Sequence, residues 1–319
     1  MYFLQERDGT MRTEPTVVTA FFDMHRGEWR SSGRSIQRYI DAFSVWTRIH
    51  NKLVVYTNAD VAEQVKRIRA EYGLLEATEI IVIDDYLALD FALYQSIEKA
   101  MKSHSSKMFH LKPNHPESWN PVYNYVMLLK WWCVCDAIRR GSTSETVAWI
   151  DFGFNNCDTL YTEPNDFDFT WLCDTDDRIN LFCINEPDDT PVFEIVQKMN
   201  TYVQGCSIVG PAKLWPEFAK LVRESMIEMN NVGFADDDQV FMLMAYRKKP
   251  DLFKLNICPW FSIFSVTSEQ SFHIRPHIET KGMKARLRVI LNRIKERQVL
   301  HEYLKQQKQI LLHKNTLND

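Results

Sequence analysis

The chain has 319 residues, of which 45% are hydrophobic and 25% charged, and its formal net charge is −4. These values are typical of a soluble globular protein with one large domain or two small ones. The seven cysteines include no Cys-x-x-Cys pair, which argues against a disulfide framework and a structural zinc site. No stretch approaches the roughly eighteen apolar residues of a membrane-spanning helix, and the N-terminus lacks a signal-peptide core. We therefore expect a cytoplasmic protein.

Charge is distributed unevenly along the chain. Residues 281–319 contain ten Lys and Arg against three Asp and Glu, so residues 1–280 carry an acidic excess. An acidic body argues against nucleic acid as a partner, whereas a basic tail suits an anionic surface. We divide the chain into a main domain, 1–280, and a basic helical appendage, 281–319.

The pattern of apolar residues predicts strands that alternate with helices. In chain order we expect a strand over 15–22, a helix over 35–49, a strand over 52–57, a helix over 59–72, a strand over 79–83, a helix over 87–102, a loop over 103–121, a helix over 123–140, a strand over 146–150, acidic turns over 158–178, strands over 179–185 and 202–209, helices over 213–229 and 236–248, and a strand over 253–257. This alternation predicts an α/β fold with a mostly parallel sheet and crossover helices.

The strand over 146–150 is the centre of this prediction. Its continuous apolar run fits a strand that is buried on both faces, and it ends at Asp151, followed by Gly153. Ligands of open α/β sheets bind at the carboxyl ends of the strands, so Asp151 is a candidate for holding a metal-bound phosphate. The alternative is that Asp151 and Gly153 only form an Asp-x-Gly turn and have no role in binding or catalysis. The Asp-Phe-Gly match to the kinase motif is set aside, because no Gly-rich loop or His-Arg-Asp motif precedes it.

Two further groups of polar residues stand at the ends of predicted elements. Asp236 is the expected N-cap of the helix over 236–248. Asp237 and Asp238 exceed what a cap requires, and neighbouring carboxylates raise one another's pKa, which suits a general base or a cation partner. His273 and His277 are candidate metal ligands or ordinary exposed loop histidines.

Several segments together resemble the HtrL/YibB family of bacterial proteins, from about Thr16 to Phe264. They are TAFFDMHRGEW, LVVYT, WIDFG, QGCSIVGPAKLWPEF, DDDQ and KKPDLFKLN. That family is grouped with GT-A glycosyltransferases and often accompanies genes for cell-surface polysaccharide. The resemblance therefore implies a GT-A-like fold and a transferase that uses a nucleotide-sugar donor, with UDP as the expected nucleotide. The rival hypothesis is a non-catalytic protein of this fold that binds nucleotide or glycan in an assembly complex.

The resemblance also implies roles for individual residues. In GT-A enzymes an Asp-x-Asp motif holds Mn²⁺ or Mg²⁺ against the donor diphosphate. Asp151 stands in the corresponding place, but the second position is Gly153, so the missing metal ligand would be His273, His277 or a water molecule. Asp237 or Asp238 would act as catalytic base in an inverting enzyme, or would orient the acceptor in a retaining one. The residues expected to bind the nucleotide-sugar are Thr19, Phe21, Arg26, Arg30, Thr57, Lys130, Asp151 and Gly153.

Trp260 and the basic tail are further candidates for contact with a sugar or a membrane. Trp260, between a strand and the histidine loop, is the tryptophan that best suits stacking on a sugar ring. Residues 282–319 interleave basic and apolar residues as in a helix that lies on an anionic membrane, where lipid-linked acceptors reside. The same apolar stripe would also suit packing on the domain or pairing of two subunits. We thus expect a glycan acceptor, with peripheral membrane contact or homo-oligomerisation through the tail.

Overall fold

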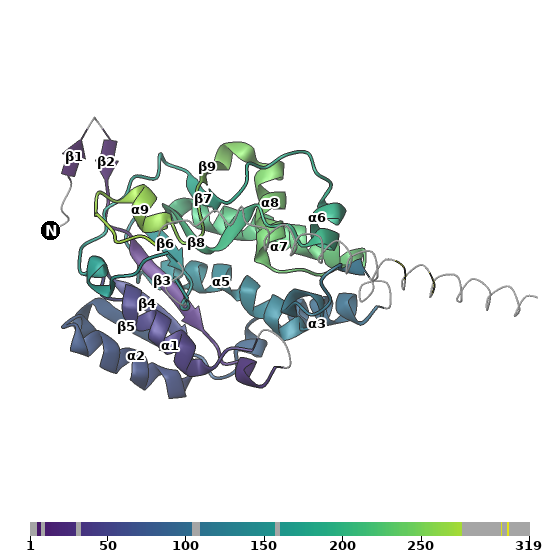
Figure 1. Cartoon of the computed structure of the whole chain (residues 1–319), viewed down its shortest axis with the longest axis horizontal. Coiled ribbons are helices and arrows are strands. Elements are labelled where there is room, and N and C mark those ends of the chain that lie inside the picture. The colour runs from purple at the N-terminus through teal and green to yellow at the C-terminus, as the bar shows by residue number, and fades with distance from the viewer. Residues whose placement is uncertain are drawn as a thin grey trace, which may run out of the picture.

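The computed structural model describes residues 5–7, 10–29, 33–103, 109–156, 160–275, 301 and 305. A seven-stranded sheet with the strand order β5-β4-β3-β6-β8-β7-β9 runs through the molecule, and a separate hairpin, β1-β2, projects from it (Figure 1). The strands are β1 (Gln5–Arg7), β2 (Thr10–Arg12), β3 (Thr16–Phe21), β4 (Leu53–Thr57), β5 (Thr78–Val82), β6 (Thr146–Ile150), β7 (Ile179–Cys183), β8 (Val203–Pro211) and β9 (Phe253–Ile257).

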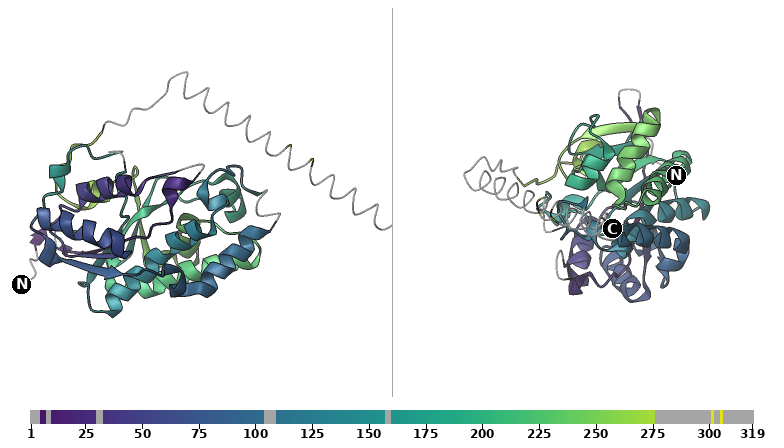
Figure 2. Two further views of the ribbon diagram at one scale, coloured as in Figure 1. Left: turned by 90° about the horizontal axis from the view of Figure 1, so that it is seen from below. Right: turned by 90° about the vertical axis from the view of Figure 1, so that its right-hand side faces the viewer.

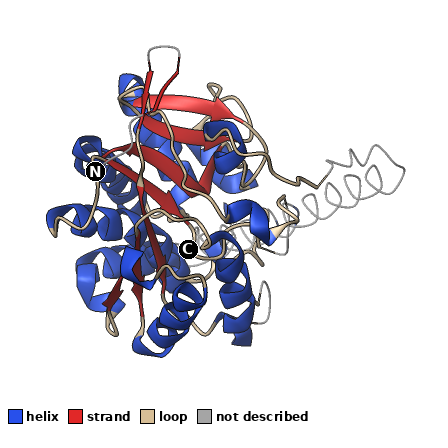
Figure 3. Cartoon of the chain, turned by 90° about the vertical axis from the view of Figure 1, so that its left-hand side faces the viewer, coloured by secondary structure: helices blue, strands red, loops and turns tan. Residues whose placement is uncertain are grey.

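Helices cover both faces of the sheet (Figures 2 and 3). The helices are α1 (Ile36–Trp46), α2 (Ala59–Glu71), α3 (Phe91–Lys102), α5 (Pro121–Arg139), α6 (Val192–Lys198), α7 (Trp215–Asn231), α8 (Asp238–Lys248) and α9 (Ile263–Thr267). One core joins the sheet to α3, α5, α6, α7 and α8, and a second core joins it to α1, α2 and α9. Neighbouring strand residues divide between the two cores: Val18 lies in the first and Val17 in the second. The prediction of an α/β fold with a mostly parallel sheet is confirmed.

One strand departs from the parallel arrangement. β3, β4, β5 and β6 are parallel, and β7 and β9 are parallel to each other, but β8 is antiparallel to both β6 and β7. The reversal brings the N-terminal end of β8 to the carboxyl end of β6, where Ile150 pairs with Ser207. The amide of Asp151 then donates a 2.9 Å hydrogen bond to the carbonyl oxygen of Cys206. β8 therefore supplies backbone to the same edge of the sheet at which β3 and β6 end.

Helix α5 delivers a charge to this edge. It begins at Pro121 behind the N-cap Asn120, whose side chain accepts hydrogen bonds from the amides of Val122 and Tyr123. The helix packs against α3, α7 and the sheet and is largely buried. Lys130 is the sole charged residue between Pro121 and Cys135. A cation in such a buried stretch requires a partner.

Candidate ligand site at the carboxyl edge of the sheet

Two adjoining hollows lie where β3 and β6 end. The first is lined from the end of β3 by Phe21 and Asp23, and by Arg26 and Tyr39. The second is lined from β8 and α8 by Gly205, Asp237 and Asp238, and by Trp260. Both hollows share the following residues: Arg34, Tyr123, Met127, Lys130, Asp151 and Gly153. Asp151, which follows the central strand, thus lines both hollows.

Lys130 connects the two aspartates that the sequence singled out. Its ammonium nitrogen lies 3.0 Å from Oδ1 of Asp151 and 2.8 Å from Oδ2 of Asp238. It also donates a 2.9 Å hydrogen bond to the carbonyl oxygen of Gly205. The indole Nε1 of Trp149 donates a 2.8 Å hydrogen bond to the same Oδ1 of Asp151. These contacts fix a charged centre of one lysine and two aspartates, which we call the lysine bridge.

The members of the lysine bridge differ in exposure. The side chains of Lys130 and Asp238 are 5% and 2% exposed, whereas that of Asp151 is 32% exposed. Burial alone lowers the pKa of Lys130, but the charges of Asp151 and Asp238 outweigh it, so the net pKa is raised. Burial raises the pKa of Asp238, and the charge of Lys130 opposes that rise. The ammonium is therefore charged at neutral pH, and Asp151 is the carboxylate of the bridge that a ligand can reach.

Two glycines allow the close packing around the lysine bridge. A Cβ atom on Gly205 would lie 2.6 Å from Oδ2 of Asp238, which is closer than van der Waals contact allows. A Cβ atom on Gly153 would lie 2.8 Å from Cδ1 of the Tyr39 ring. Position 153 corresponds to the second aspartate of an Asp-x-Asp motif. The ring of Tyr39 occupies the space that a side chain at this position would need.

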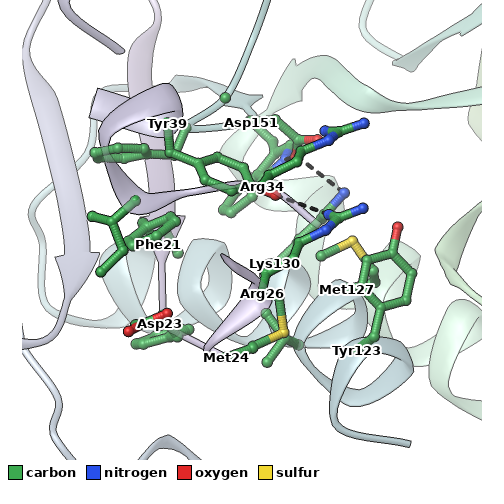
Figure 4. A pocket seen from close by; sticks show the side chains of 17 residues that line it. Phe21, Asp23, Met24, Arg26, Arg34, Tyr39, Tyr123, Met127, Lys130 and Asp151 are labelled. Carbon is green, nitrogen blue, oxygen red and sulfur yellow. Dashed lines mark hydrogen bonds and ion pairs between the residues drawn. The ribbon is translucent and has the colours of Figure 1, made fainter. Parts of the chain in front are cut away.

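Arginine side chains join Lys130 at the first hollow. Arg26 is only 9% exposed, and its Nη1 donates a 2.8 Å hydrogen bond to the hydroxyl of Tyr39. Its guanidinium lies 5.2 Å from the ring centroids of both Trp29 and Tyr123, so the side chain is held in place by aromatic faces. Figure 4 shows Arg26, Arg34 and Lys130 reaching into this hollow beside Asp151. Such a group of cations suits a phosphate-bearing ligand.

The three aspartates at the start of α8 are all buried, at 7%, 7% and 1% exposure for Asp236, Asp237 and Asp238. The prediction that Asp236 caps the helix is wrong: the N-cap is Asp237, whose Oδ1 accepts a hydrogen bond from the amide of Gln239. Asp236 instead accepts from the amide of Asp237. Burial raises the pKa of Asp236 to about 8, with the charges of Glu117 and Asp238 adding to it. Burial and the neighbouring aspartates also raise the pKa of Asp237 well above its ordinary value.

The structure places other expected site residues away from the hollows. Thr19 and Thr57 are fully buried, and the hydroxyl of Thr57 donates to the carbonyl oxygen of Phe21, so these threonines are packing residues. His273 is not among the residues lining either hollow, and its Nδ1 lies 3.0 Å from Oδ1 of Asp166. That carboxylate raises the pKa of His273. Arg30 and His277 lie outside the described residues.

Sequence reasoning missed Arg34, Arg38, Tyr39 and Gly205. Arg38 lines the second hollow and donates from Nε to Oδ1 of Asn156. Arg34 and Arg38 precede or begin a predicted helix, where a solvent-exposed arginine gives no signal of its own. A signal did exist for Lys130, the isolated charge in an apolar helix, and it predicts a buried ion pair although not the partners.

The described residues fit a divalent cation poorly. Within the described ranges, no group of three or more His, Cys, Asp or Glu side chains is placed to hold a metal ion. Of the bridge carboxylates, Asp238 is buried and tied to Lys130, and Oδ1 of Asp151 already accepts from Trp149 and Lys130. A lysine ammonium already lies between the two carboxylates that a metal would share.

The fold and this site define an α/β protein with a cleft at the carboxyl edge of its sheet that is lined by arginine, lysine and aspartate side chains. Residues 13–269 match the family model described as "Bacterial protein of unknown function (HtrL_YibB)". The chain is also 33% identical over 273 residues to Protein HtrL of Escherichia coli (strain K12), covering 80% of this chain and 92% of that protein. The chain therefore belongs to the HtrL/YibB family, as the resemblance indicated.

Two solved structures are similar at low sequence identity. One is mouse xyloside xylosyltransferase 1 in its apo form, with 12% identity, a TM-score of 0.41, and coverage of 77% of this chain and 89% of that one. The other is the PaToxG glycosyltransferase, with 12% identity, a TM-score of 0.31, and coverage of 90% and 79%.

Proposed function

We propose that this protein is a glycosyltransferase that moves a sugar from a nucleotide-sugar donor, with UDP as the expected nucleotide, to a cell-surface polysaccharide, lipopolysaccharide or lipid-linked glycan. The observation that carries the proposal is that Arg26, Arg34 and Lys130 line one hollow at the carboxyl end of β6. Cations that converge at this edge of an α/β sheet suit a donor diphosphate. The sequence motifs resemble a family that is grouped with GT-A enzymes, and such enzymes bind a donor diphosphate.

In the proposed reaction the bond between the sugar anomeric carbon and the diphosphate oxygen breaks, and a bond to the acceptor oxygen forms. The nucleoside diphosphate leaves with the electron pair, and nearby cations stabilise its growing charge. The acceptor hydroxyl loses its proton to a carboxylate. Asp237 suits this role better than Asp238, because Asp238 is 1% exposed and held by Lys130. Trp260, at the second hollow, is placed to stack on a sugar.

Donor hydrolysis tests this proposal. Purified protein is incubated with a panel of UDP-, GDP-, ADP- and dTDP-sugars, and release of the nucleoside diphosphate is followed, with and without Mn²⁺ or Mg²⁺. We expect slow release from one donor and loss of that release in Asp237→Asn, with donor binding retained because the base acts after the donor is seated.

The rival function is binding of a nucleotide or glycan without turnover. It is favoured by one observation: position 153 is a glycine packed against Tyr39, where an Asp-x-Asp enzyme carries a metal ligand. Binding of a nucleoside diphosphate with no hydrolysis or transfer from any donor would support this rival. No binding of any nucleotide in the panel would contradict both functions.

A further inference from the structure

We infer that this site holds the diphosphate of its donor through the guanidinium groups of Arg26 and Arg34, with the Lys130 ammonium in the place of a shared cation, and requires no divalent metal ion. The inference rests on the proposed function, since it concerns the donor of that reaction. It departs from the metal expected of a GT-A-like enzyme, and it follows from how the charges of the site are arranged.

The lysine ammonium already occupies the position of a cation shared by two carboxylates. It lies within 3.0 Å of Asp151 and 2.8 Å of Asp238, so it stands where a cation shared by the two carboxylates would stand. The carbonyl oxygen of Gly205 supplies a third oxygen at 2.9 Å. Three oxygens around one nitrogen satisfy the three donors of an ammonium group. A divalent ion at this point would have to displace a buried lysine from all three.

Within the part of the chain that the structure describes, no group of three or more His, Cys, Asp or Glu side chains offers a replacement ligand set. The Tyr39 ring occupies the space that a side chain at position 153 would need. His273 has Asp166 as its partner and does not line the hollows. Only Asp151 presents a partly exposed carboxylate of the bridge to a ligand, and a single carboxylate is a weak holder of Mn²⁺ or Mg²⁺.

Two arginines of the chain line the first hollow beside Asp151. Arg26 is fixed by the Tyr39 hydroxyl and by the rings of Trp29 and Tyr123. A fixed guanidinium loses little further side-chain entropy on binding, and it matches phosphate oxygens in a bidentate manner. Arg34 and Lys130 line the same hollow from the segment before α1 and from α5. The two guanidinium groups would contact the diphosphate, while the Lys130 ammonium keeps its three oxygen partners.

The test is calorimetric titration of the full-length protein with UDP, GDP, ADP and dTDP, once in EDTA and once with Mn²⁺. We expect one nucleotide to bind with the same affinity in both conditions. Arg34→Ala, which alters a partly exposed residue, should weaken that binding in EDTA by about tenfold or more, the loss expected for one charge-assisted contact. Arg67→Ala, at an exposed position on α2, is the matched control and should bind as the wild type does.

A second variant examines the lysine bridge itself. Lys130→Met removes the ammonium and leaves two carboxylates facing each other, so it should lose nucleotide binding in EDTA and gain binding of Mn²⁺ alone, seen by electron paramagnetic resonance. Circular dichroism would confirm that the variant is folded, and Arg34→Ala carries the test if it is not. Nucleotide binding by the wild type only with Mn²⁺, or Mn²⁺ binding by the wild type that Asp151→Asn abolishes, would overturn the inference and leave the glycosyltransferase proposal standing. Binding of no nucleotide in either condition would instead contradict the proposed function.

Discussion

The lysine bridge requires a glycine at position 205, because a side chain there would clash with Asp238. We expect Gly205→Ala to destabilise the fold by about 1–3 kcal/mol, because the new methyl group would overlap Oδ2 of the buried Asp238. Urea denaturation gives the free energy of unfolding. Gly27→Ala is the control, since its Cβ would meet no atom closer than 3.8 Å. Equal stability of the two variants would mean that Asp238 does not approach β8 as described.

Asp236 should make the protein's stability fall as the pH rises. Its pKa is about 8 in the folded state and about 3.9 in an unfolded chain. Between these values the folded carboxyl keeps a proton that the unfolded one has released, so stability decreases by up to about 1.4 kcal/mol per pH unit. The Asp236→Asn variant has a side chain at this position that does not titrate. Its unfolding free energy relative to the wild type should therefore increase from pH 5 to pH 8.

Urea denaturation at several pH values measures this difference. Asp60→Asn, at an exposed position in the first turn of α2, serves as the control and should track the wild type. Parallel stability curves for Asp236→Asn and the wild type would contradict a raised pKa at position 236.

Individual residues of the site were predictable to different degrees. Asp151 was found because a lone carboxylate after an all-apolar strand is a local signal. The pairing of Lys130 with Asp238 was not predicted, because the two residues are 108 positions apart and meet only through the packing of α5, β8 and α8. Thr19 and Thr57 show the opposite error. The family resemblance implied ligand contact for both, yet both side chains are fully buried and neither lines a hollow.

At the scale of elements, Arg69 joins α2 to its neighbours. The fully buried guanidinium donates to the carbonyl oxygens of Thr47, Ile49 and Asn51, beyond the end of α1, and to the hydroxyl of Thr78 at the start of β5. Burial lowers its pKa to about 10. Arg69→Met should cost about 3 kcal/mol or more, because it leaves several buried carbonyl groups without a donor.

Thermal and urea unfolding would measure that loss. Arg67→Ala lies on the exposed side of the same helix and should change stability by no more than about 0.5 kcal/mol. A loss in Arg69→Met no greater than this would show that water replaces the guanidinium.

The elements themselves were largely readable from the sequence, because β-branched runs and helical periodicity are local signals. Strands β3, β4, β5, β6, β7, β8 and β9 and the longer helices fall where expected. The hairpin β1-β2 and the short helices α6 and α9 were missed, since three to seven residues give too little periodicity. The direction of β8 was also not foreseen. A buried apolar run reads the same whether its partner is parallel or antiparallel.

At the scale of the whole molecule, we propose that the basic tail holds the protein at an anionic membrane. No helix within the described ranges is long and apolar enough to cross a bilayer, and residues 282–319 lie outside them, apart from residues 301 and 305. Each Lys or Arg near such a surface contributes about 1 kcal/mol. Full-length protein should float with anionic liposomes at low salt and stay behind at high salt. A chain that ends at residue 281 should not float, and equal flotation of both chains would sink the idea.

The lysine bridge also places a constraint on how the protein is made. Lys130 leaves the ribosome 108 residues before Asp238, an interval of about 5–20 seconds at ordinary translation rates. During that time Asp151 is the one carboxylate of the lysine bridge that becomes available, and the buried partner Asp238 has not yet been made. We therefore expect the α5 layer to close fully around Lys130 only after α8 has been synthesised. Nascent chains stalled before residue 238 should remain open to protease near α5, whereas chains stalled well beyond α8 should resist it.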